Sequence, residues 1–394
     1  MLDRAVQAIV FRQFDRFTSG ALSVTLPDGS TRTFGPGGAP AASLRVLHPR
    51  FFRRLARSAD IGFGEAWQHG EIDSPDLVAL LRFFIANRPA AVDAPTRLSL
   101  AGRAFNRLRH LARRNSLANS RGNIQAHYDL GNEFYRRFLD PTMMYSGAVF
   151  TSPEQSLHDA QLNKIGGLIG MADPQPGDRL LEIGCGWGGF AMEAARRTGC
   201  SVHGLTLSDA QLALARERVA EAGLSGRVNL EIRDYRRLDG VYDRLVSIEM
   251  LEAVGHEYLD TFFHTCGNAL KTGGRFALQV ITIPDERYDA YRRGTDWIQR
   301  HVFPGGHLPS VGAITDSVRR VSRMTIERVE ELGQNYVPTI QHWREGFQRN
   351  WGEIRTFGFD DYFRRTWDYY LAYCEAAFGT GQIHLHQFEL VRRA

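Results

Sequence analysis

The stretch Asp178-Arg-Leu-Leu-Glu-Ile-Gly-Cys-Gly-Trp-Gly-Gly-Phe190 decides the fold of this 394-residue chain. Its apolar residues Leu180, Leu181 and Ile183 predict a buried strand, and the glycines that follow predict a turn into a helix beginning near Gly188. Glycines let backbone N–H groups approach a ligand closely at the N-terminus of a helix. The sequence therefore predicts a ligand-binding loop at the carboxyl end of this strand.

Glu182 narrows the choice of ligand, because it lies inside the strand just before the glycines. A carboxylate there would face an anionic pyrophosphate unfavourably, whereas it suits the amino and sulfonium cations of S-adenosylmethionine (SAM). No Lys-Ser/Thr pair follows these glycines, as one does in a phosphate-binding loop. We interpret the loop as a SAM site; a dinucleotide loop or an ordinary strand-to-helix turn is the alternative.

Strand and helix patterns alternate through the middle of the chain. Such alternation predicts an α/β fold, a parallel sheet with helices on both faces and ligands at the carboxyl ends of the strands. Together with the SAM loop, it indicates a Rossmann-like SAM-dependent methyltransferase sheet. A long interruption at about 283–311 is typical of a lid or a substrate wall. The expected strands are near 179–184, 200–206, 228–232, 242–248 and 274–281, and the expected helices near 188–198, 208–223 and 258–270.

Residues 1–88 predict a small α+β domain for lipid or membrane contact. An amphipathic helix is expected within 1–20, because apolar residues recur there every three or four positions. The remaining expected elements are a hairpin over 22–33, a strand and a helix over 44–56, and a helix capped by Ser74-Pro75 that ends near Asn87.

Residues 89–121 are predicted to be a basic linker before a catalytic domain over 122–394. Residues 1–121 hold 18 arginines and 9 acidic residues, a net charge of +9 in a chain whose overall charge is +4. The part from 97 to 121 can lie on an anionic bilayer or be a solvated linker. Since no apolar run approaches the ~20 residues of a membrane span, we expect a cytoplasmic protein, peripheral at the inner face of the membrane.

Several stretches together resemble the cyclopropane fatty acid synthase family, which includes the mycolic acid cyclopropane synthases. The glycine loop marks only the methyltransferase superfamily. Far more specific are His127-Tyr-Asp-Leu-Gly131, Tyr145-Ser146 and Pro304-Gly-Gly-His-Leu-Pro309. The order and spacing of the motifs fit the family from about residue 122 to the C-terminus; the other matching stretches are 181–189, 204–208, 233–236 and 247–255.

The resemblance implies transfer of a methyl group from SAM to the cis double bond of an unsaturated phospholipid acyl chain. Attack of the π electrons on the methyl leaves a carbocation, which aromatic faces and a buried carboxylate can stabilise. Loss of a proton from the transferred methyl, in the family thought to go to a bound bicarbonate, closes a cyclopropane ring. Loss of a different proton would give a methyl-branched unsaturated chain, which is the alternative product.

The resemblance also implies a catalytic site, and two of its positions depart from the family. Glu252 matches the family's bicarbonate-site glutamate and Tyr336 its tyrosine, and a hydrogen bond between the two is expected. Gly147, however, stands where a Cys usually follows Tyr-Ser, and Gln279, near Ile281, stands where many members have His. A backbone N–H and a neutral amide could still hold an anion. Tolerated drift and functional divergence both stay open.

For SAM, the resemblance and the strand-end positions predict three groups of contacts. The methionine end is expected at Tyr145, Ser146, Glu182, Gly184 and Gly186. The ribose is expected at Thr206 and Gln211, and the adenine at Asp234 and Tyr235.

A rival of another class is a catalytically weak regulatory protein that binds lipid and SAM, and the presence of Glu252 and Tyr336 argues against it. Methylation of RNA or of a small molecule is disfavoured, because the apolar, aromatic C-terminal region suits acyl chains better than bases. The expected partner is therefore a phospholipid bilayer and not nucleic acid. A homodimer and a separate reductase are further expectations, and no metal is expected.

Overall fold

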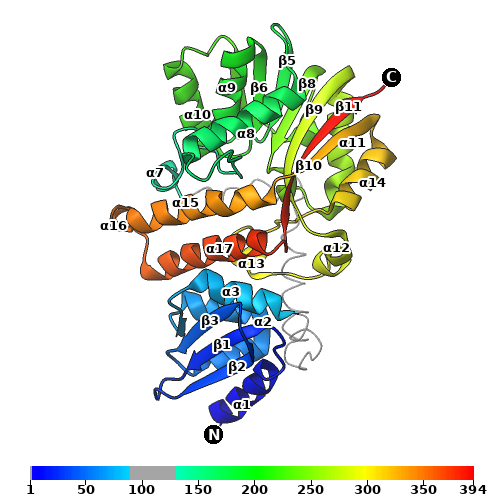
Figure 1. Cartoon of the computed structure of the whole chain (residues 1–394). Helices are drawn as coiled ribbons and strands as arrows, with labels where there is room; N and C mark the ends of the chain where they lie inside the picture. Colours follow the sequence, from blue (N-terminus) through cyan, green and yellow to red (C-terminus); the bar gives the residue numbers. More distant parts are fainter. Residues whose placement is uncertain (1, 89–129) are drawn as a thin grey trace. The chain divides into compact units, whose positions relative to one another are not determined.

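The computed structural model of the protein describes residues 2–88 and 130–394 (Figure 1). In it, the glycine-rich stretch connects one strand of a seven-stranded sheet to the helix that follows this strand. The described chain forms two compact units. The second unit, which holds this sheet, comprises residues 130–292, 303–347 and 383–394; the first comprises 2–88, 293–302 and 348–382. The predicted basic linker and the His127-Tyr-Asp sequence lie outside the described residues.

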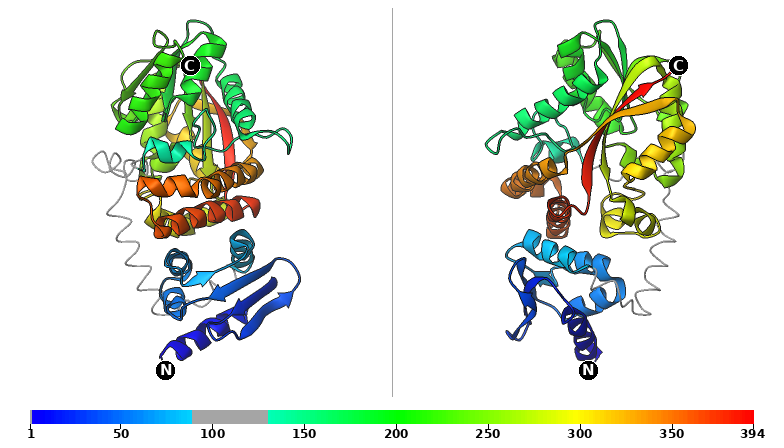
Figure 2. Two further views of the ribbon diagram at one scale, coloured as in Figure 1. Left: turned by 90° about the vertical axis from the view of Figure 1, so that its left-hand side faces the viewer. Right: turned by 45° about the vertical axis from the view of Figure 1, so that its right-hand side comes forward.

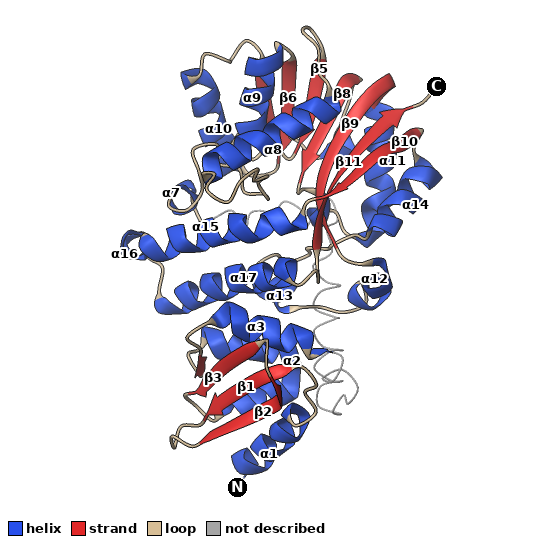
Figure 3. Ribbon diagram, in the orientation of Figure 1, coloured by secondary structure: helices blue, strands red, loops and turns tan. Residues whose placement is uncertain are grey.

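The large sheet has the strand order β10-β11-β9-β8-β5-β6-β7 (Figure 3). Strands β9, β8, β5, β6 and β7 run parallel to one another, and β11 runs antiparallel to both β9 and β10. Figure 2 shows the ribbon from two further directions. The five strands expected from the sequence are present, and the sequence did not indicate β10 and β11. The strands are β5 (Arg179–Ile183), β6 (Ser201–Thr206), β7 (Val228–Ile232), β8 (Tyr242–Ile248), β9 (Leu270–Thr282), β10 (Met324–Glu331) and β11 (His384–Arg392).

Helices cover both faces of this sheet. Successive side chains of a strand point to opposite faces, and here apolar side chains on both faces pack against helices. Leu180 of β5 packs in a cluster with α8 (Leu157–Ala172), α9 (Gly189–Thr198) and α10 (Asp209–Glu221). Its neighbour Leu181 packs in a second cluster with α11 (Leu259–Ala269) and α14 (Val311–Val321). The predicted α/β fold, with helices on both faces of the sheet, is confirmed.

Shorter elements complete the second unit around the strand ends. They are α7 (Asn132–Arg136), α12 (Asp285–Tyr291), most of α15 (Tyr336–Arg349) and the 3₁₀ turns η1 (Tyr235–Arg237), η2 (Leu251–Ala253), η3 (His256–Tyr258) and η4 (Gly333–Asn335).

The first unit is built on a four-stranded sheet of order β2-β1-β3-β4. The expected hairpin is present, since β1 and β2 pair antiparallel, and the expected first helix is α1. The elements are α1 (Leu2–Phe14), β1 (Gly20–Thr25), β2 (Thr31–Gly37), β3 (Ala41–Val46), α2 (Arg50–Gln68), β4 (Ile72–Asp73), α3 (Leu77–Ala86), α13 (Trp297–His301), α16 (Trp351–Ile354), η5 (Arg355–Phe357) and α17 (Asp361–Gly379).

The cap of α3 is not the one we expected. Its N-cap is Asp76, whose carboxylate accepts a hydrogen bond from the Ala79 N–H at 2.9 Å, while the Ser74 hydroxyl donates to the Asp76 carbonyl. A carboxylate at the N-cap satisfies an N–H that the helix itself cannot.

Two late segments of the chain belong to the first unit. The Arg365 guanidinium of α17 donates to the carbonyl of Ile72 at 2.7 Å, and the Trp297 indole of α13 donates to the Gln68 side chain at 3.3 Å. The sequence indicated a single catalytic domain over 122–394, whereas the structure groups 293–302 and 348–382 with the N-terminal residues. As a division by activity, the three expected domains stay a prediction.

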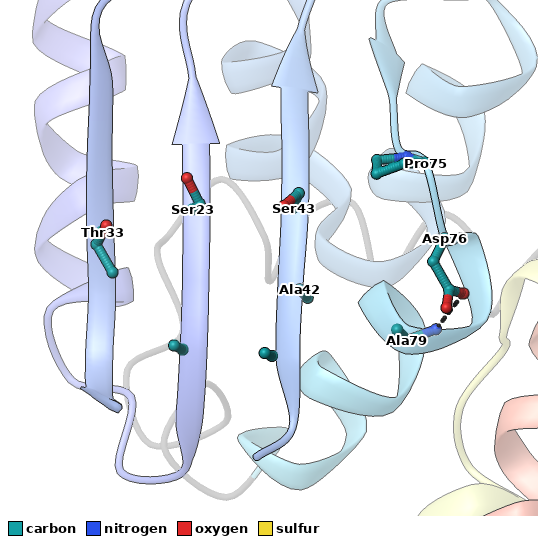
Figure 4. Close-up of a pocket in the computed structure, with 9 residues that line it drawn as sticks. Ser23, Thr33, Ala42, Ser43, Pro75, Asp76 and Ala79 are labelled. Atoms are coloured by element: carbon teal, nitrogen blue, oxygen red, sulfur yellow. Dashed lines mark hydrogen bonds between the residues drawn. The ribbon is translucent and has the colours of Figure 1, made fainter. Parts of the chain in front are cut away.

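The first unit also has a small hollow on its sheet (Figure 4). Asp76 is the one charged residue among those that line the hollow, and the Asp76 carboxylate already caps α3. None of the site residues predicted from the sequence lies in it; the lining residues are Ala21, Ser23, Thr33, Ala41, Ala42, Ser43, Pro75, Asp76 and Ala79.

Candidate active site

The glycine loop at the end of β5 has the backbone that its sequence predicted. Gly184, Gly186 and Gly188 have φ values of +91°, +50° and +78°, in the left-handed region that favours glycine. The N–H groups of Gly184 and Cys185 both donate to the Leu205 carbonyl of β6 at 2.9 Å. A Cβ on Gly184 would lie 2.9 Å from Cγ of Met250, so position 184 has no room for a side chain.

Glu182 is buried beside the loop, and its Oε2 accepts no hydrogen bond from the described residues. Burial raises the pKa of Glu182 to about 8, and the charge of Lys164 acts in the opposite direction. A buried carboxylate with an open acceptor position fits a cationic group of a ligand, since an isolated buried charge is costly. The residues present therefore fit the amino group or the sulfonium of SAM.

Lys164 is a site residue that the sequence analysis missed. It is fully buried on α8, and its Nζ donates to the Ser146 hydroxyl at 2.6 Å. Burial lowers the pKa of Lys164 to about 8, although the charges of Glu249, Asp140 and Glu182 favour the ammonium. One sequence signal could have identified it, because it is one of only two lysines in a chain with 46 arginines.

The residues predicted for ribose and adenine lie at the ends of β6 and β7. Thr206 donates to Gln211 Oε1 at 3.1 Å, and both side chains are buried. Asp234 pairs with Arg236 at 2.6 Å, whereas the Tyr235 ring packs on Phe262 with centroids 5.3 Å apart. The structure thus brings Thr206 and Gln211 together and places Tyr235 in the apolar cluster. All four roles in SAM binding stay predictions.

Three of the predicted catalytic residues meet around a carboxylate that we did not predict, that of Glu249. Glu249 Oε1 accepts hydrogen bonds from the Gly147 N–H and from Gln279 Nε2, both at 2.8 Å. Its Oε2 accepts the Tyr336 hydroxyl at 2.6 Å. The expected hydrogen bond from Tyr336 to Glu252 is therefore wrong, because the hydroxyl is turned to Glu249 instead.

Glu252 lies near this group with a different set of contacts. Its Oε1 accepts the Ile281 N–H at 2.5 Å, while its buried Oε2 has no hydrogen-bond partner among the described residues. Burial raises the pKa of Glu252 to about 8, and the charge of Glu249 adds to that rise. The structure thus pairs Glu252 with Ile281, as two members of the predicted set, and leaves one carboxyl oxygen open.

An aromatic wall adjoins the carboxylates. Tyr145 packs on Tyr135 of α7 and on Trp343 of α15, with ring centroids 5.4 and 5.1 Å apart, and Trp343 also packs on Tyr336 at 6.0 Å. Gly147 is part of this packing, because a Cβ there would lie 2.8 Å from the Tyr336 ring and from Leu385. Aromatic faces and carboxylates stabilise a cation without attacking it as water would.

A methyltransferase-type sheet, a glycine loop and a buried carboxylate for a cationic ligand define a SAM-dependent methyltransferase, for which SAM is the co-substrate. Residues 115–388 match the family model described as mycolic acid cyclopropane synthetase, and the chain belongs to this family.

Known relatives cover most of the chain. It is 37% identical over 403 residues to the tuberculostearic acid methyltransferase UfaA1 of Mycobacterium tuberculosis, covering 98% of this chain and 92% of that protein. It is 35% identical over 355 residues to the cyclopropane-fatty-acyl-phospholipid synthase of Escherichia coli K12, covering 89% and 88%. Among solved structures, mycolic acid cyclopropane synthase CmaA1 complexed with SAH and CTAB is similar, with a TM-score of 0.64, 32% identity and coverage of 69% and 98%.

Proposed function

We propose that this enzyme transfers the methyl group of SAM to the cis double bond of an unsaturated phospholipid acyl chain and that its product is a methyl-branched chain. The observation that carries the proposal is the group of aromatic rings and carboxylates beside the glycine loop, formed by Tyr145, Trp343, Tyr336, Glu249 and Glu252. Methyl transfer to an alkene leaves a carbocation, and such a group stabilises positive charge while excluding water.

The similarity to the tuberculostearic acid methyltransferase supports the branched product, because it extends over nearly the whole chain. The similarity to the cyclopropane-fatty-acyl-phospholipid synthase supports a lipid substrate, and it makes the cyclopropane ring the second candidate product. Gly147 and Gln279, which depart from the family pattern, both donate to Glu249, so the two departures meet at one carboxylate. A separate reductase would be needed to saturate a branched alkene.

The test is mass spectrometry of lipids from a host that expresses the chain. A mass gain of one methylene in unsaturated acyl chains is expected, and derivatisation specific for double bonds then separates a branched alkene, which reacts, from a ring, which does not. A folded, SAM-binding protein that labels no acyl chain would favour the regulatory alternative.

The proposed site of action is the surface of an anionic membrane. No described helix is both long and apolar enough to cross a bilayer. The basic segment 97–121, which lies outside the described residues, would be attracted to anionic lipid by charge that salt screens over roughly 8–10 Å. Replacing Arg107, Arg109, Arg113 and Arg114 by Glu should weaken sedimentation with anionic vesicles, and unchanged binding in both the mutant and a salt series would make the segment a linker.

A further inference from the structure

The backbone at Glu249 indicates that its side chain is kept for a purpose. Glu249 directly follows β8 and has φ +49°, in the left-handed region. The left-handed conformation destabilises the folded protein by roughly 1–3 kcal/mol when the residue is not glycine, so glycine would be less strained at this position. Strain of this kind persists where the surrounding structure holds the residue, and it often marks a functional site.

Three hydrogen bonds hold the Glu249 carboxylate in place and leave a lone-pair position of Oε2 without a donor among the described residues. Two N–H groups, from Gly147 and Gln279, donate to Oε1, and the Tyr336 hydroxyl donates to Oε2. Gln279 is itself fixed, since Gln387 Nε2 donates to its Oε1 at 2.7 Å, which leaves its NH₂ group facing Glu249. This orientation is the one that serves an anion.

These three donors belong to the residues that the family resemblance assigned to bicarbonate. Here a carboxylate of the chain itself accepts their hydrogen bonds. Gly147 also lets the Tyr336 ring come close, because any side chain there would collide with that ring and with Leu385. A cysteine at position 147, as the family pattern has it, would therefore require Tyr336 to move away from Glu249.

We propose that the Glu249 carboxylate is the proton acceptor of this enzyme and takes the place of bicarbonate. The inference rests on the proposed function, because an acyl carbocation is the species that Glu249 would deprotonate. It names a catalytic residue that the sequence analysis did not include.

The proposed step balances with the groups at hand. When the π electrons of the alkene bond the methyl carbon, the C–S bond breaks towards sulfur and the neighbouring acyl carbon becomes cationic. Glu249 then takes a proton from a carbon next to the cation, and the electrons of that C–H bond form the new π bond of a methyl-branched alkene. The proton stays on Glu249 as a carboxylic acid and leaves to water after product release. No oxidant or reductant enters this balance.

The surroundings of Glu249 act on its pKa in two directions. Burial raises the pKa of Glu249, and the hydrogen bonds from Tyr336, Gln279 and Gly147 act in the opposite direction. Glu252, whose pKa is also raised, faces the same group and lacks comparable donors, so it is the partner that holds a proton when only one of the two is charged. Lys164 adds a nearby positive charge.

The first experiment measures single turnover with labelled SAM in buffer freed of carbon dioxide. Wild-type turnover should not change when bicarbonate is removed or restored. Glu249→Gln should slow turnover by about 10²- to 10⁴-fold, the usual contribution of a general base, with unchanged SAM affinity by calorimetry. A wild-type enzyme that requires bicarbonate, or a Glu249→Gln variant with normal turnover, would overturn the proposal.

The second experiment uses Glu249→Gly, which keeps the left-handed backbone and frees the three donors. Labelled bicarbonate should bind this variant and not the wild type, as read by ¹³C NMR, and should restore part of its turnover. Asp173→Gly is the matched control, because Asp173 has φ +48° at the end of α8 and is outside the site. Bicarbonate binding to the wild type would contradict the proposal. This readout needs no lipid, so it separates failure of the proposed base from failure of the proposed function, in which no acyl chain is labelled.

Discussion

Two neighbouring strands of the large sheet end in turns of the same handedness but with different residues. Strand β5 ends before Gly184, at φ +91°, and the adjacent parallel strand β8 ends before Glu249, at φ +49°. Gly184 has no side chain, whereas Glu249 presents a carboxylate with three donors around it. The same left-handed backbone thus has two outcomes: a residue without a side chain at one strand end, and a carboxylate at the other.

The two turns also constrain one another. The Cβ that Gly184 lacks would lie 2.9 Å from Cγ of Met250, the residue directly after Glu249. Glycine after β5 therefore makes room for the turn after β8. The left-handed conformation costs a non-glycine residue roughly 1–3 kcal/mol, so we expect it to be tolerated after β8 only because the carboxylate is needed there.

The largest expected effect is on the glycine turn. Gly186→Val should lower SAM affinity by at least about a hundredfold, because a β-branched residue at φ +50° strains the loop and enters the space expected for the methionine end. Calorimetry measures the affinity. Gly177→Val is the control, since Gly177 also has positive φ, +88°, in the turn before β5. Undiminished affinity in a folded Gly186→Val variant would move the SAM site away from this loop.

The next effect concerns the carboxylate turn. Tyr336→Phe removes the hydroxyl that donates to Glu249 at 2.6 Å. A hydrogen bond to a charged group contributes about 1.5–3 kcal/mol, so the single-turnover rate should fall about ten- to a hundredfold with little change in SAM affinity. The exposed Tyr362→Phe is a control that should turn over normally. A normal rate in Tyr336→Phe would show that this hydroxyl does not position the carboxylate.

A smaller effect separates Glu252 from Glu249. Because the folded-state pKa of Glu252 lies near 8, above its ordinary value, its contribution to stability is present at low pH and is lost as pH rises towards 8. Glu252→Gln, which resembles the protonated acid, should remove this loss and be the more stable protein at pH 8 by on the order of 1 kcal/mol. Denaturant unfolding across pH tests this, with the exposed Glu154→Gln as control. Parallel curves for Glu252→Gln and wild type would contradict it.

The smallest effect returns to the glycine turn. The pKa of Glu182 is raised to about 8, so the free enzyme holds a proton there at neutral pH, and a cationic ligand should expel it. SAM affinity should therefore rise several-fold from pH 6 to pH 7, a range in which Lys164, with its pKa of about 8, keeps most of its charge. Calorimetry in buffers of different ionisation enthalpy counts the released proton. Binding without proton release would mean that Glu182 does not face the cation.

Much of the second unit could be predicted because its patterns are local. Apolar runs bounded by glycines located β5 to β9 closely, and the glycines after β5 indicated their own left-handed backbone. Glu252 was singled out because it is a carboxylate in an apolar run after a strand, and Glu249 stands in the same run three residues earlier. The pattern alone could not tell which of the two receives the donors.

The sequence by itself determined the strand-to-helix alternation, the glycine loop and the set of polar residues available at the strand ends, because each depends on residues close together in the chain. Only the tertiary structure decided that Gly147, Gln279 and Tyr336 meet at Glu249 and not at Glu252. It likewise decided that Lys164 is buried against Ser146 and that 348–382 pack with the N-terminal residues. Hydrogen-bond donors from a loop, β9 and α15 converge on one carboxylate only after those elements pack, and no spacing along the chain encodes that convergence.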